Sequence, residues 1–473
     1  MSTTTSMTPG TNTGQNDEGA NASRRLAEHV AAIGREPLAP DVVHAFRRAF
    51  LDFLTCAIAG SAMPVSRTLM DYFAETDATR VASVIGTPLR LSAQNAAFVN
   101  GANVHGLDFD DGFTQGSVHP AGSVFSALMA AAQTTGASDR SIVAAAAAGY
   151  DITCRIASAI HPATARRGYH NTAIAGVFGA TAAVCNLYRL DAAQTLHALG
   201  LAGSFSAGIR EYLDEGAEIK RIHPGKAARD GLLCADLARR GITGPSRVLE
   251  GRYGFFRTHL DVDAGEVKWA RLFEALGERL EITGVYFKPY PCCRHYHACI
   301  DGIRALCAAH AITAAQVEHI HMGLYAVGAN GHDHKHVDSL LDAQMSAPCA
   351  AALAIVCGDV TAQDFLPATL DRPDVRALID CCETVIDPEC ERVYPGVRTG
   401  YVRLHLRDGR VFEQRVVSPR GEKENPMTDD DLIAKFTSNC TPLIGSARAG
   451  TMLREVWRMG DGADMATFNE WSA

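Results

Sequence analysis

Residues 104–120, VHGLDFDDGFTQGSVHP, bring acidic and imidazole side chains together in an otherwise apolar, alanine-rich chain. The stretch contains the aspartates Asp108, Asp110 and Asp111, and His119 stands near its end. Neighbouring carboxylates repel one another unless water, a metal ion or a cationic group offsets their charge. The stretch is therefore a metal site, a proton-transfer site or a solvated loop, and the rest of the chain has to decide between them.

A second polar group precedes a very apolar segment, RRGYHNTAIAG, in which His170 is followed by Asn171 and Thr172. The free N–H groups and the dipole of a helix N-terminus favour anions. His170 is thus a candidate for the site, and its alternative role is simple capping or a place in a solvated loop.

Two basic groups follow later in the chain. IKRIHPGKAARDG carries Lys220, Arg221, His223 and Lys226, a run that alone would be typical of a solvated helix face. KPYPCCRHYHACIDG carries Lys288, Arg294, His295 and His297, which alone would fit a joint between domains with incidental charge.

Together, the carboxylates, imidazoles and cations suit proton transfer on a substrate with several carboxylates. A carbanion beside a carboxylate is dianionic and needs cations that are in place before it forms. A histidine can remove or deliver the proton. We therefore expect Lys220 and Arg294 to hold substrate carboxylates. We expect His170 and His119 to carry protons, with Asp108 orienting one of them and Asp110 and Asp111 behind it.

Metal binding and nucleotide binding find less support. His332, His334 and His336 alternate in NGHDHKHVDS, which is either a metal site or a mobile loop that closes over the site. The cysteines of PCCRHYHAC do not have the spacing of zinc or iron–sulfur ligands. The chain has no GxGxxG, GxxxxGK[ST] or GxSxG motif, so dinucleotide binding, Walker-type binding and that hydrolase elbow are not indicated.

Composition describes an ordinary globular chain. Its 473 residues are 47% hydrophobic and 21% charged, with a net charge of −9, which gives no reason to bind nucleic acid or an anionic membrane. The apolar run 141–159 is interrupted by Asp151 and Arg155, a poor pattern for a membrane span. We read residues 1–21 as a disordered leader without targeting features, and the 14 cysteines as reduced thiols of a cytoplasmic protein.

The elements that must position these residues change type along the chain. Val43, Phe46, Phe50, Phe53 and Ala57 form one face of a helix. Near Leu280 the pattern changes to strand-like segments, LEITGVYFKPY, VEHIHMGLYAV and a hairpin that turns at Asp408-Gly409. We predict a mainly α protein: a helical domain over 22–280, an α+β lid domain over 281–425, and helices of 426–473 that return to the first domain, with the active site in the cleft between the domains.

A series of motifs in this chain resembles the MmgE/PrpD family, which includes 2-methylcitrate dehydratase, cis-aconitate decarboxylase and iminodisuccinate epimerase. The motifs are NGANVHGLDFDD, VHPAG, GYHNTAIAGVFGA, ALGLAGS, IKRIHPGKAARDG, GITGP, LEGRYGFF, KPYPCCRHYHACIDG and AQMSAPCAAALA, in that order. The resemblance covers almost everything after residue 22. It implies a helical domain built from both chain ends with an inserted lid, a homodimer, and no metal or organic cofactor.

The resemblance also suggests the site residues. Its catalytic positions fall on Asp108, His119, His170, Lys220 and His297, with His295 as an alternative to His297 because of the doubled HYH. We expect the small polycarboxylate substrate to contact Asn103, Thr114, Thr172, His223, Lys288 and Arg294.

The sequence departs from the decarboxylase branch, which resembles D-F-D-D-T. Here Gly112 follows the aspartates, the nearest threonine is Thr114, and the link from Asp108 to His119 is one residue longer. On this basis we expect a hydro-lyase similar to 2-methylcitrate dehydratase, in which His119 protonates the departing hydroxyl. A decarboxylase and an epimerase use the same stabilised carbanion and stay as alternatives. A helical scaffold or binding protein would leave the dispersed His and Lys groups unexplained.

Overall fold

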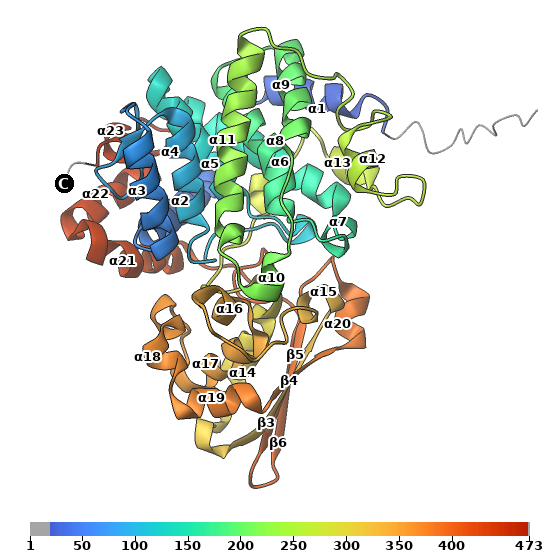
Figure 1. The fold of residues 1–473 in the computed structure, drawn as a ribbon, viewed down its shortest axis with the longest axis vertical. Coiled ribbons are helices and arrows are strands. Elements are labelled where there is room, and N and C mark those ends of the chain that lie inside the picture. Colours follow the sequence, from blue (N-terminus) through green and yellow to red (C-terminus); the bar gives the residue numbers. More distant parts are fainter. Residues whose placement is uncertain (1–18, 472–473) are drawn as a thin grey trace, which may run out of the picture.

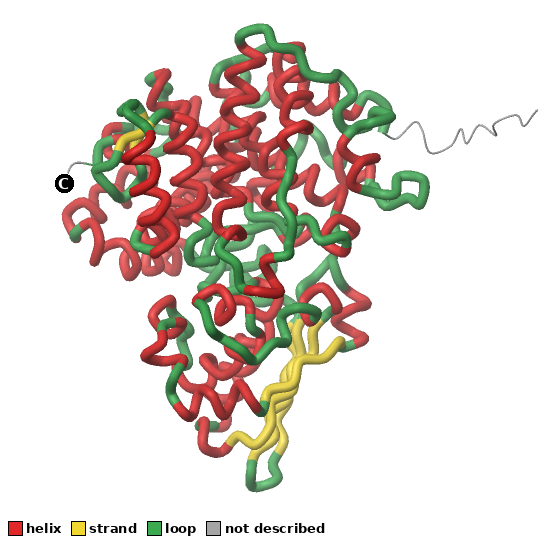
Figure 2. The backbone as a smooth tube through the Cα atoms, viewed as in Figure 1, coloured by secondary structure: helices red, strands yellow, loops and turns green. Residues whose placement is uncertain are grey.

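The computed structural model describes residues 19–471. Most of the predicted leader, residues 1–18, therefore lies outside the described residues. The fold is mainly α-helical, as predicted, with one sheet of any size (Figure 2) among the residues described. Figure 1 shows a larger helical part and a smaller part that holds this sheet, with the short helix α10 (Tyr212–Glu215) at the boundary between them.

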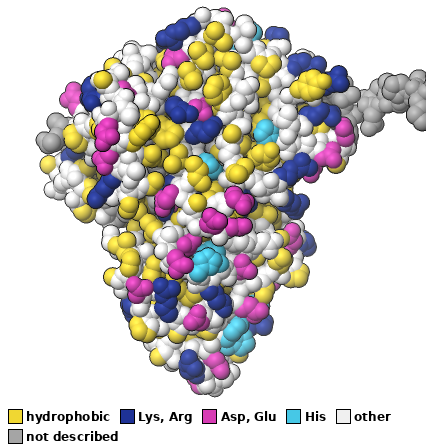
Figure 3. Space-filling model, viewed as in Figure 1, with side chains coloured by type: hydrophobic (Ala, Val, Ile, Leu, Met, Phe, Trp, Pro, Cys, Tyr) yellow, Lys and Arg dark blue, Asp and Glu magenta, His cyan; other side chains and the backbone are white. Residues whose placement is uncertain are grey.

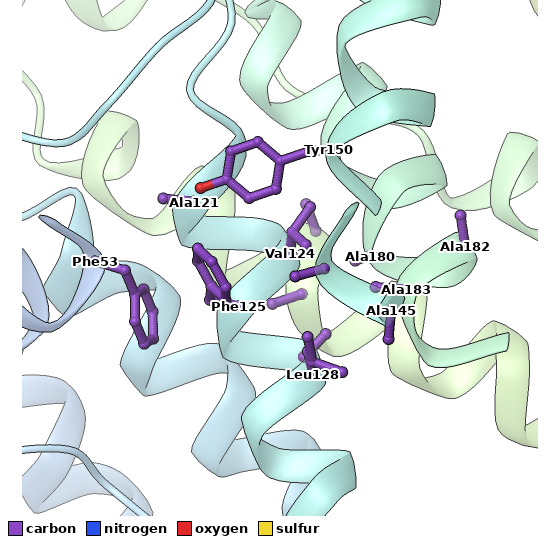
Figure 4. Packing of buried hydrophobic residues seen from close by; sticks show 14 of the residues in the cluster. Phe53, Ala121, Val124, Phe125, Leu128, Ala145, Tyr150, Ala180, Ala182 and Ala183 are labelled. Atoms are coloured by element: carbon purple, nitrogen blue, oxygen red, sulfur yellow. The ribbon is translucent and has the colours of Figure 1, made fainter. Parts of the chain in front are cut away.

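The centre of the larger part is a stack of alanine-rich helices that approach one another closely. α5 (Pro120–Thr135), α6 (Asp139–Ile160) and α8 (Asn171–Leu187) pack together. Figure 4 shows Val124 of α5 on the side of the alanines of α8, and Phe125 of α5 on the side of Phe53. Gly149 and Gly179 face each other across α6 and α8, where a Cβ on either would meet the other's carbonyl oxygen. Small side chains therefore set the spacing of these helices.

α6 alone among the described helices is long and apolar enough to be considered as a membrane span, and 94% of its most apolar window is buried inside the protein. Its Arg155 and Asp151 form a buried ion pair of 2.6 Å. Both observations describe a helix of the hydrophobic core.

Helices from the two chain ends pack on each other in the larger part. The predicted face of α2 (Pro40–Ser61) is confirmed, since Phe46, Phe50, Phe53 and Ala57 are fully buried. α21 (Asp429–Ile444) packs against α2 and begins with a capping box formed by Thr428 and Asp431. Phe468 meets Phe50 edge to face, with 5.2 Å between ring centroids. α11 (Ile219–Arg239) packs against α4 (Ala93–Val104) and α8.

The remaining elements of this part lie around this centre. They are α1 (Ala22–Ala32), α3 (Pro64–Thr76), α7 (Ala163–Arg166), α9 (Ala192–Phe205), α12 (Phe255–His259), α13 (Trp269–Phe273), α22 (Ser446–Arg458), α23 (Ala466–Asn469) and the short strands β1 (Ala82–Ser83) and β2 (Arg90–Leu91).

The smaller part is a four-stranded sheet with helices on one face. The strand order is β4 (Cys382–Ile386), β3 (Val317–Leu324), β5 (Gly400–Leu406), β6 (Val411–Val416), and only the β4–β3 pair is parallel. The predicted hairpin is confirmed, with Gly409 in the left-handed region at its turn. α14 (His297–His310) packs against β5 and β6. The other helices here are α15 (Ala326–Ala329), α16 (Leu340–Met345), α17 (Ala347–Cys357), α18 (Pro367–Leu370), α19 (Pro373–Asp380) and α20 (Pro388–Val393).

The predicted strand in LEITGVYFKPY is wrong. Residues Glu281–Gly284 form a 3-10 turn, and the extended segment that follows pairs only at Tyr286, by an isolated bridge to Gly112. The aromatic and β-branched residues reflect burial rather than a sheet, since Ile282, Val285 and Phe287 belong to the core of the larger part. Tyr290 and the residues after it join a separate hydrophobic cluster in the smaller part, so this segment is the crossing between the two cores.

Candidate active site

A small cavity lies where the two hydrophobic clusters meet, and its wall combines residues of both parts. Among the described residues that line it, one is acidic, Asp108, and five carry fixed positive charge. The cationic side chains are Arg210, Lys220, Lys288, Arg294 and Arg398. The histidines in the wall are His119, His170, His295 and His332.

Asp108 joins the two lysines of this wall. Its Oδ1 lies 2.5 Å from Nζ of Lys220 and 3.3 Å from Nζ of Lys288, which also donates to the Asp108 carbonyl at 2.7 Å. Burial alone would raise the pKa of Asp108, but the ammonium groups of Lys220 and Lys288 outweigh it and hold the pKa well below its usual range. Asp108 therefore contacts two lysines, instead of the histidine that we expected it to orient.

A second carboxylate, Asp110, holds His105, and His105 in turn contacts Lys220. Asp110 bonds to Nδ1 of His105 at 2.9 Å, and Nε2 of His105 lies 3.1 Å from Lys220 Nζ. The ammonium must donate there, so His105 is neutral with its proton on Nδ1. Lys220 is thereby held between Asp108 and His105. Burial lowers the pKa of Lys220 and Asp108 partly restores it, with the net result a pKa below the usual value for lysine.

The third aspartate belongs to the helical core. Asp111 accepts hydrogen bonds from the Tyr150 hydroxyl at 2.8 Å and from the backbone N–H of Ala121, the second residue of α5. Burial and the nearby Asp52 carboxylate raise its pKa well above the usual range. Asp108, Asp110 and Asp111 are all at most 2% exposed, which excludes the solvated-loop alternative.

Two of the expected catalytic histidines stand at helix starts. His119 is the N-cap residue of α5, and His170 is that of α8. His119 donates through Nδ1 to the Asp111 carbonyl at 2.5 Å, and burial with the Lys288 charge lowers its pKa to about 3. Burial and His223 lower the pKa of His170 well below its usual range. Both rings are therefore neutral at neutral pH.

The smaller part supplies the opposite wall. Arg294 bonds to Glu422 at 3.0 Å and donates to Nδ1 of His297 at 2.9 Å. His297 is fully buried behind Arg294 and is not among the residues that line the cavity, whereas the alternative, His295, is. Nδ1 of His295 shares a hydrogen bond of 2.7 Å with the Tyr325 hydroxyl.

Tyr286 lies close to two arginines of this wall. The Cζ atoms of Arg294 and Arg398 lie 4.5 and 5.5 Å from its ring centroid. Its backbone exchanges two hydrogen bonds with Gly112, and a Cβ on Gly112 would overlap the Tyr286 hydroxyl.

The other expected substrate contacts lie outside the cavity wall. Thr114 donates to the Glu422 carboxylate at 2.8 Å, and the Thr172 hydroxyl accepts from the backbone N–H of His119 at 3.1 Å. Nδ1 of His223 lies 2.9 Å from Nδ1 of His170. Asn103 is fully buried in α4, and its side-chain amide has no hydrogen-bond partner among residues 19–471. Thr172 and His223 thus hold a histidine of the cavity wall in place, and Thr114 holds Glu422, the partner of Arg294.

Sequence reasoning missed several residues of the wall. Arg210 and Arg398 stand in segments without a motif, and Arg398 comes just before β5. His332 was placed in a mobile or metal-binding loop, but it is 1% exposed and donates through Nδ1 to the Met345 carbonyl at 2.9 Å. Of the three, only Arg398 stands near a recognisable sequence pattern, the hairpin that follows it.

Among residues 19–471, two groups of side chains have ligand atoms near enough to hold a metal ion: His105, Asp108 and Asp110, and Cys293, His295 and His332. In the first group the position of a cation beside Asp108 is taken by two ammonium groups. The second group stands in the same wall as five fixed positive charges, which repel a divalent ion. Neither group suits a metal ion well.

The charge of the cavity is local. On the face of the molecule in Figure 3, acidic and basic side chains are mixed, and the whole chain is negative by 9 charges. The excess of cations in the cavity is therefore a property of the site, and it favours a small anion.

Fold and site together define a mainly helical protein with a small cationic cavity at the boundary with a smaller α+β part. The chain belongs to the MmgE/PrpD family, because residues 24–266 match the MmgE/PrpD N-terminal domain and residues 290–459 match the MmgE/PrpD C-terminal domain.

The chain is also similar over most of its length to curated proteins. It is 27% identical to the cis-aconitate decarboxylase-like protein oryM of Aspergillus oryzae over 466 residues, which cover 94% of this chain and 96% of the relative. It is 25% identical to a cis-aconitate decarboxylase of Aspergillus terreus, with 93% of each chain covered. It is 23% identical to the cis-aconitate decarboxylase of Homo sapiens, with 92% of this chain and 90% of the human protein covered.

Proposed function

We propose that this protein is a lyase that decarboxylates a small polycarboxylate of the cis-aconitate type. The observation that carries the proposal is the charge of the cavity, where five cationic side chains face a single carboxylate among the described lining residues. A substrate with two or three carboxylates balances this charge, and the similar curated proteins are named as cis-aconitate decarboxylases.

The proposed reaction breaks the bond between a carboxylate and its neighbouring carbon. Carbon dioxide leaves, and the electron pair of the broken bond forms a new carbon–carbon double bond. The electrons of the original double bond move to the carbon beside another carboxylate, which shares the negative charge. The developing charge is stabilised by cations already in place, which is where electrostatic catalysis is most effective. One proton then completes the product, a methylene-substituted dicarboxylate.

We assign the delivery of that proton to Lys220. It is charged, lines the cavity, and has a pKa below the usual value for lysine because of its burial. Asp108 and His105 hold its ammonium group in one place. His119 and His170 are neutral at neutral pH, which suits them to accept a proton or a hydrogen bond rather than to act as strong acids.

Dehydration, our expectation from the sequence, is the second candidate. It rested on Gly112 in place of a threonine and on protonation of a leaving hydroxyl by His119. Gly112 is not among the residues that line the cavity, and its size is required by the Tyr286 ring. The pKa of His119, lowered to about 3 by burial and Lys288, makes the ring a weak source of protons at neutral pH. These observations favour decarboxylation.

A substrate panel tests the proposal. Purified protein is assayed with cis-aconitate, 2-methylcitrate, citrate and iminodisuccinate, beside a Lys220→Met variant and a matched surface control, Lys423→Met, which changes an exposed lysine. We expect turnover of cis-aconitate with release of carbon dioxide, a loss of about 10²–10⁴ in kcat for Lys220→Met, and no change for the control. Turnover of 2-methylcitrate alone, with water as the coproduct, would replace the proposal by dehydration.

The resemblance further suggests a homodimer, and the composition suggests a cytoplasmic protein; both stay predictions. Light scattering on the full chain should give twice the 50.5 kDa of one chain. A mass of one chain at micromolar concentration would contradict the dimer.

A further inference from the structure

We infer that Arg398 forms a second carboxylate subsite, which holds the carboxylate of the substrate that lies farther from Lys220. The inference rests on the proposed function for the class of substrate, a small polycarboxylate. Arg398 had no place in the sequence-based site, and it emerges only from the geometry of the cavity wall.

The guanidinium of Arg398 is buried with donors left over. The residue is 2% exposed and lines the cavity. Nη1 donates to the Tyr286 hydroxyl at 3.3 Å, while Nε and Nη2 have no hydrogen-bond partner within the described part of the chain. Buried donors without partners are costly, so a buried guanidinium with two of them indicates a ligand.

The two free donors have a particular geometry. Nε–H and one N–H of Nη2 lie on the same edge of the planar guanidinium and point in parallel. This edge matches the two oxygens of one carboxylate and binds it through two charge-assisted hydrogen bonds. A fork of this kind selects a carboxylate over a single-point acceptor such as a carbonyl or hydroxyl.

The surroundings keep the fork free and in place. The carboxylate that Arg398 would otherwise meet, Glu422, is already bonded to Arg294 at 3.0 Å and to Thr114 at 2.8 Å. The Tyr286 ring lies near both guanidinium groups, with 4.5 Å from its centroid to Cζ of Arg294 and 5.5 Å to Cζ of Arg398. Arg398 is thus fixed by an aromatic ring and a hydroxyl rather than neutralised by a protein carboxylate.

Arg398 and Lys220 reach the cavity from different parts of the molecule. Lys220 is in the first turn of α11, in the larger part, and Arg398 stands two residues before β5, in the smaller part. A ligand with carboxylates on both therefore joins the two parts. A monocarboxylate can satisfy one of them but not both, so the number of carboxylates decides the affinity.

The test measures binding of inert polycarboxylates, because binding does not depend on turnover. Tricarballylate has three carboxylates and glutarate has two, on the same three-carbon backbone, and butyrate has one. Affinities are measured by titration calorimetry for the wild type, Arg398→Met, Arg398→Lys, and a matched control, Arg403→Met, which removes an exposed arginine from β5 of the same hairpin.

We expect Arg398→Met to weaken tricarballylate by about 10- to 100-fold, the range for a charge-assisted pair of hydrogen bonds. Butyrate should change little, and Arg398→Lys should fall in between because lysine keeps the charge and loses the fork. The Arg403→Met control should bind like the wild type. Equal affinity of the wild type and Arg398→Met for tricarballylate would overturn the subsite, and so would a wild type that binds none of the three acids.

Thermal unfolding separates ligand binding from a structural role. Arg398→Met removes a poorly compensated buried charge, so the ligand-free variant should unfold at the wild-type temperature or above it. The rise in unfolding temperature on adding tricarballylate should shrink in the variant. A ligand-free variant that unfolds at a much lower temperature would show that Arg398 supports the fold, and would overturn the inference.

Two more outcomes are distinguishable. Inorganic phosphate is titrated in parallel, and if Arg398→Met weakens phosphate while leaving tricarballylate unaffected, the fork serves a phosphate and the inference is wrong. If tricarballylate binds in an Arg398-dependent way but cis-aconitate is not turned over, the subsite stands and the proposed reaction fails. If cis-aconitate is turned over but the affinities do not depend on Arg398, the proposed reaction stands and the subsite is wrong.

Discussion

Gly112 lies directly against the hydroxyl end of the Tyr286 side chain, and the backbones of the two residues exchange hydrogen bonds of 3.0 and 2.8 Å. Tyr286 in turn lies near both Arg294 and Arg398 and accepts a hydrogen bond from Arg398. The glycine that distinguishes this sequence from the decarboxylase pattern is therefore a packing requirement, and it shapes the arginine wall without touching the substrate itself.

Replacing Gly112 by threonine should displace the Tyr286 ring. Overpacking of a buried site costs about 1–3 kcal/mol, so the free energy of unfolding in urea should fall by that amount. Tricarballylate should also bind more weakly, because both arginines lose the position of the ring that they contact. Unchanged stability and affinity in Gly112→Thr would contradict this relationship.

Asp108 should matter for both stability and the protonation of Lys220. Asp108→Asn leaves two buried ammonium groups without their carboxylate, and breaking a buried ion pair costs about 3–5 kcal/mol. Asp108 also raises the pKa of Lys220. Without it that pKa falls further, so the alkaline limb of the pH–rate profile should move to lower pH. An alkaline limb at the same pH in Asp108→Asn as in the wild type would show that Lys220 does not deliver the proton.

Buried neutral histidines should make the protein less stable in acid. The pKa of His119 is lowered from 6.5 to about 3, first by burial and then by Lys288. Below pH 6.5 the unfolded chain binds a proton on His119 and the folded chain does not. The contribution of His119 to the free energy of unfolding is therefore fully present above that pH. It falls as pH decreases from 6.5 toward 3, by about 1.4 kcal/mol per pH unit for each such histidine.

The raised pKa values of Asp52 and Asp111 oppose this trend, because the folded chain takes up protons on these carboxyls at a higher pH than the unfolded chain does. The comparison with a His119→Gln variant removes their contribution. Its unfolding free energy should depend less on pH between 7 and 5.5 than that of the wild type. Parallel curves for the two proteins would contradict the neutral state of His119.

Chelators should leave activity intact. The carboxylate of Asp108 already contacts two ammonium groups, and a divalent ion beside Cys293, His295 and His332 would meet five fixed positive charges. The proposed reaction uses protein cations in the role that a metal ion has elsewhere. Activity abolished by prolonged dialysis against a chelator and restored by one divalent metal would refute this use of lysine and arginine.

The helices and the hairpin were predictable from local pattern. The face of α2 follows a period of 3.6 residues, and the Asp408-Gly409 turn has the residues that such a turn requires. The segment around Tyr286 was not, because its aromatic and β-branched residues are buried between two cores without forming a sheet. A hydrophobic pattern indicates which residues are buried. In this segment the residues are buried without pairing as a strand.

The site was predictable to the extent that its residues stand in motifs. Asp108, Lys220 and Lys288 are polar residues in apolar or recognisable stretches. In the structure both lysine Nζ atoms lie within 3.3 Å of the Asp108 carboxylate. Arg398 and His332 stand in ordinary turn sequences. Their burial depends on how the two parts meet, which no local pattern of the sequence expresses.

The most direct measurement of the central claim follows cis-aconitate by proton NMR in D₂O while released carbon dioxide is trapped and counted. We predict one carbon dioxide per substrate consumed, a methylene-substituted dicarboxylate as the product, and one solvent deuterium on a carbon of that product. The Lys220→Met variant should lose this reaction and the Lys423→Met control should keep it. Full recovery of unchanged cis-aconitate, or its conversion without carbon dioxide, would contradict the proposed decarboxylation.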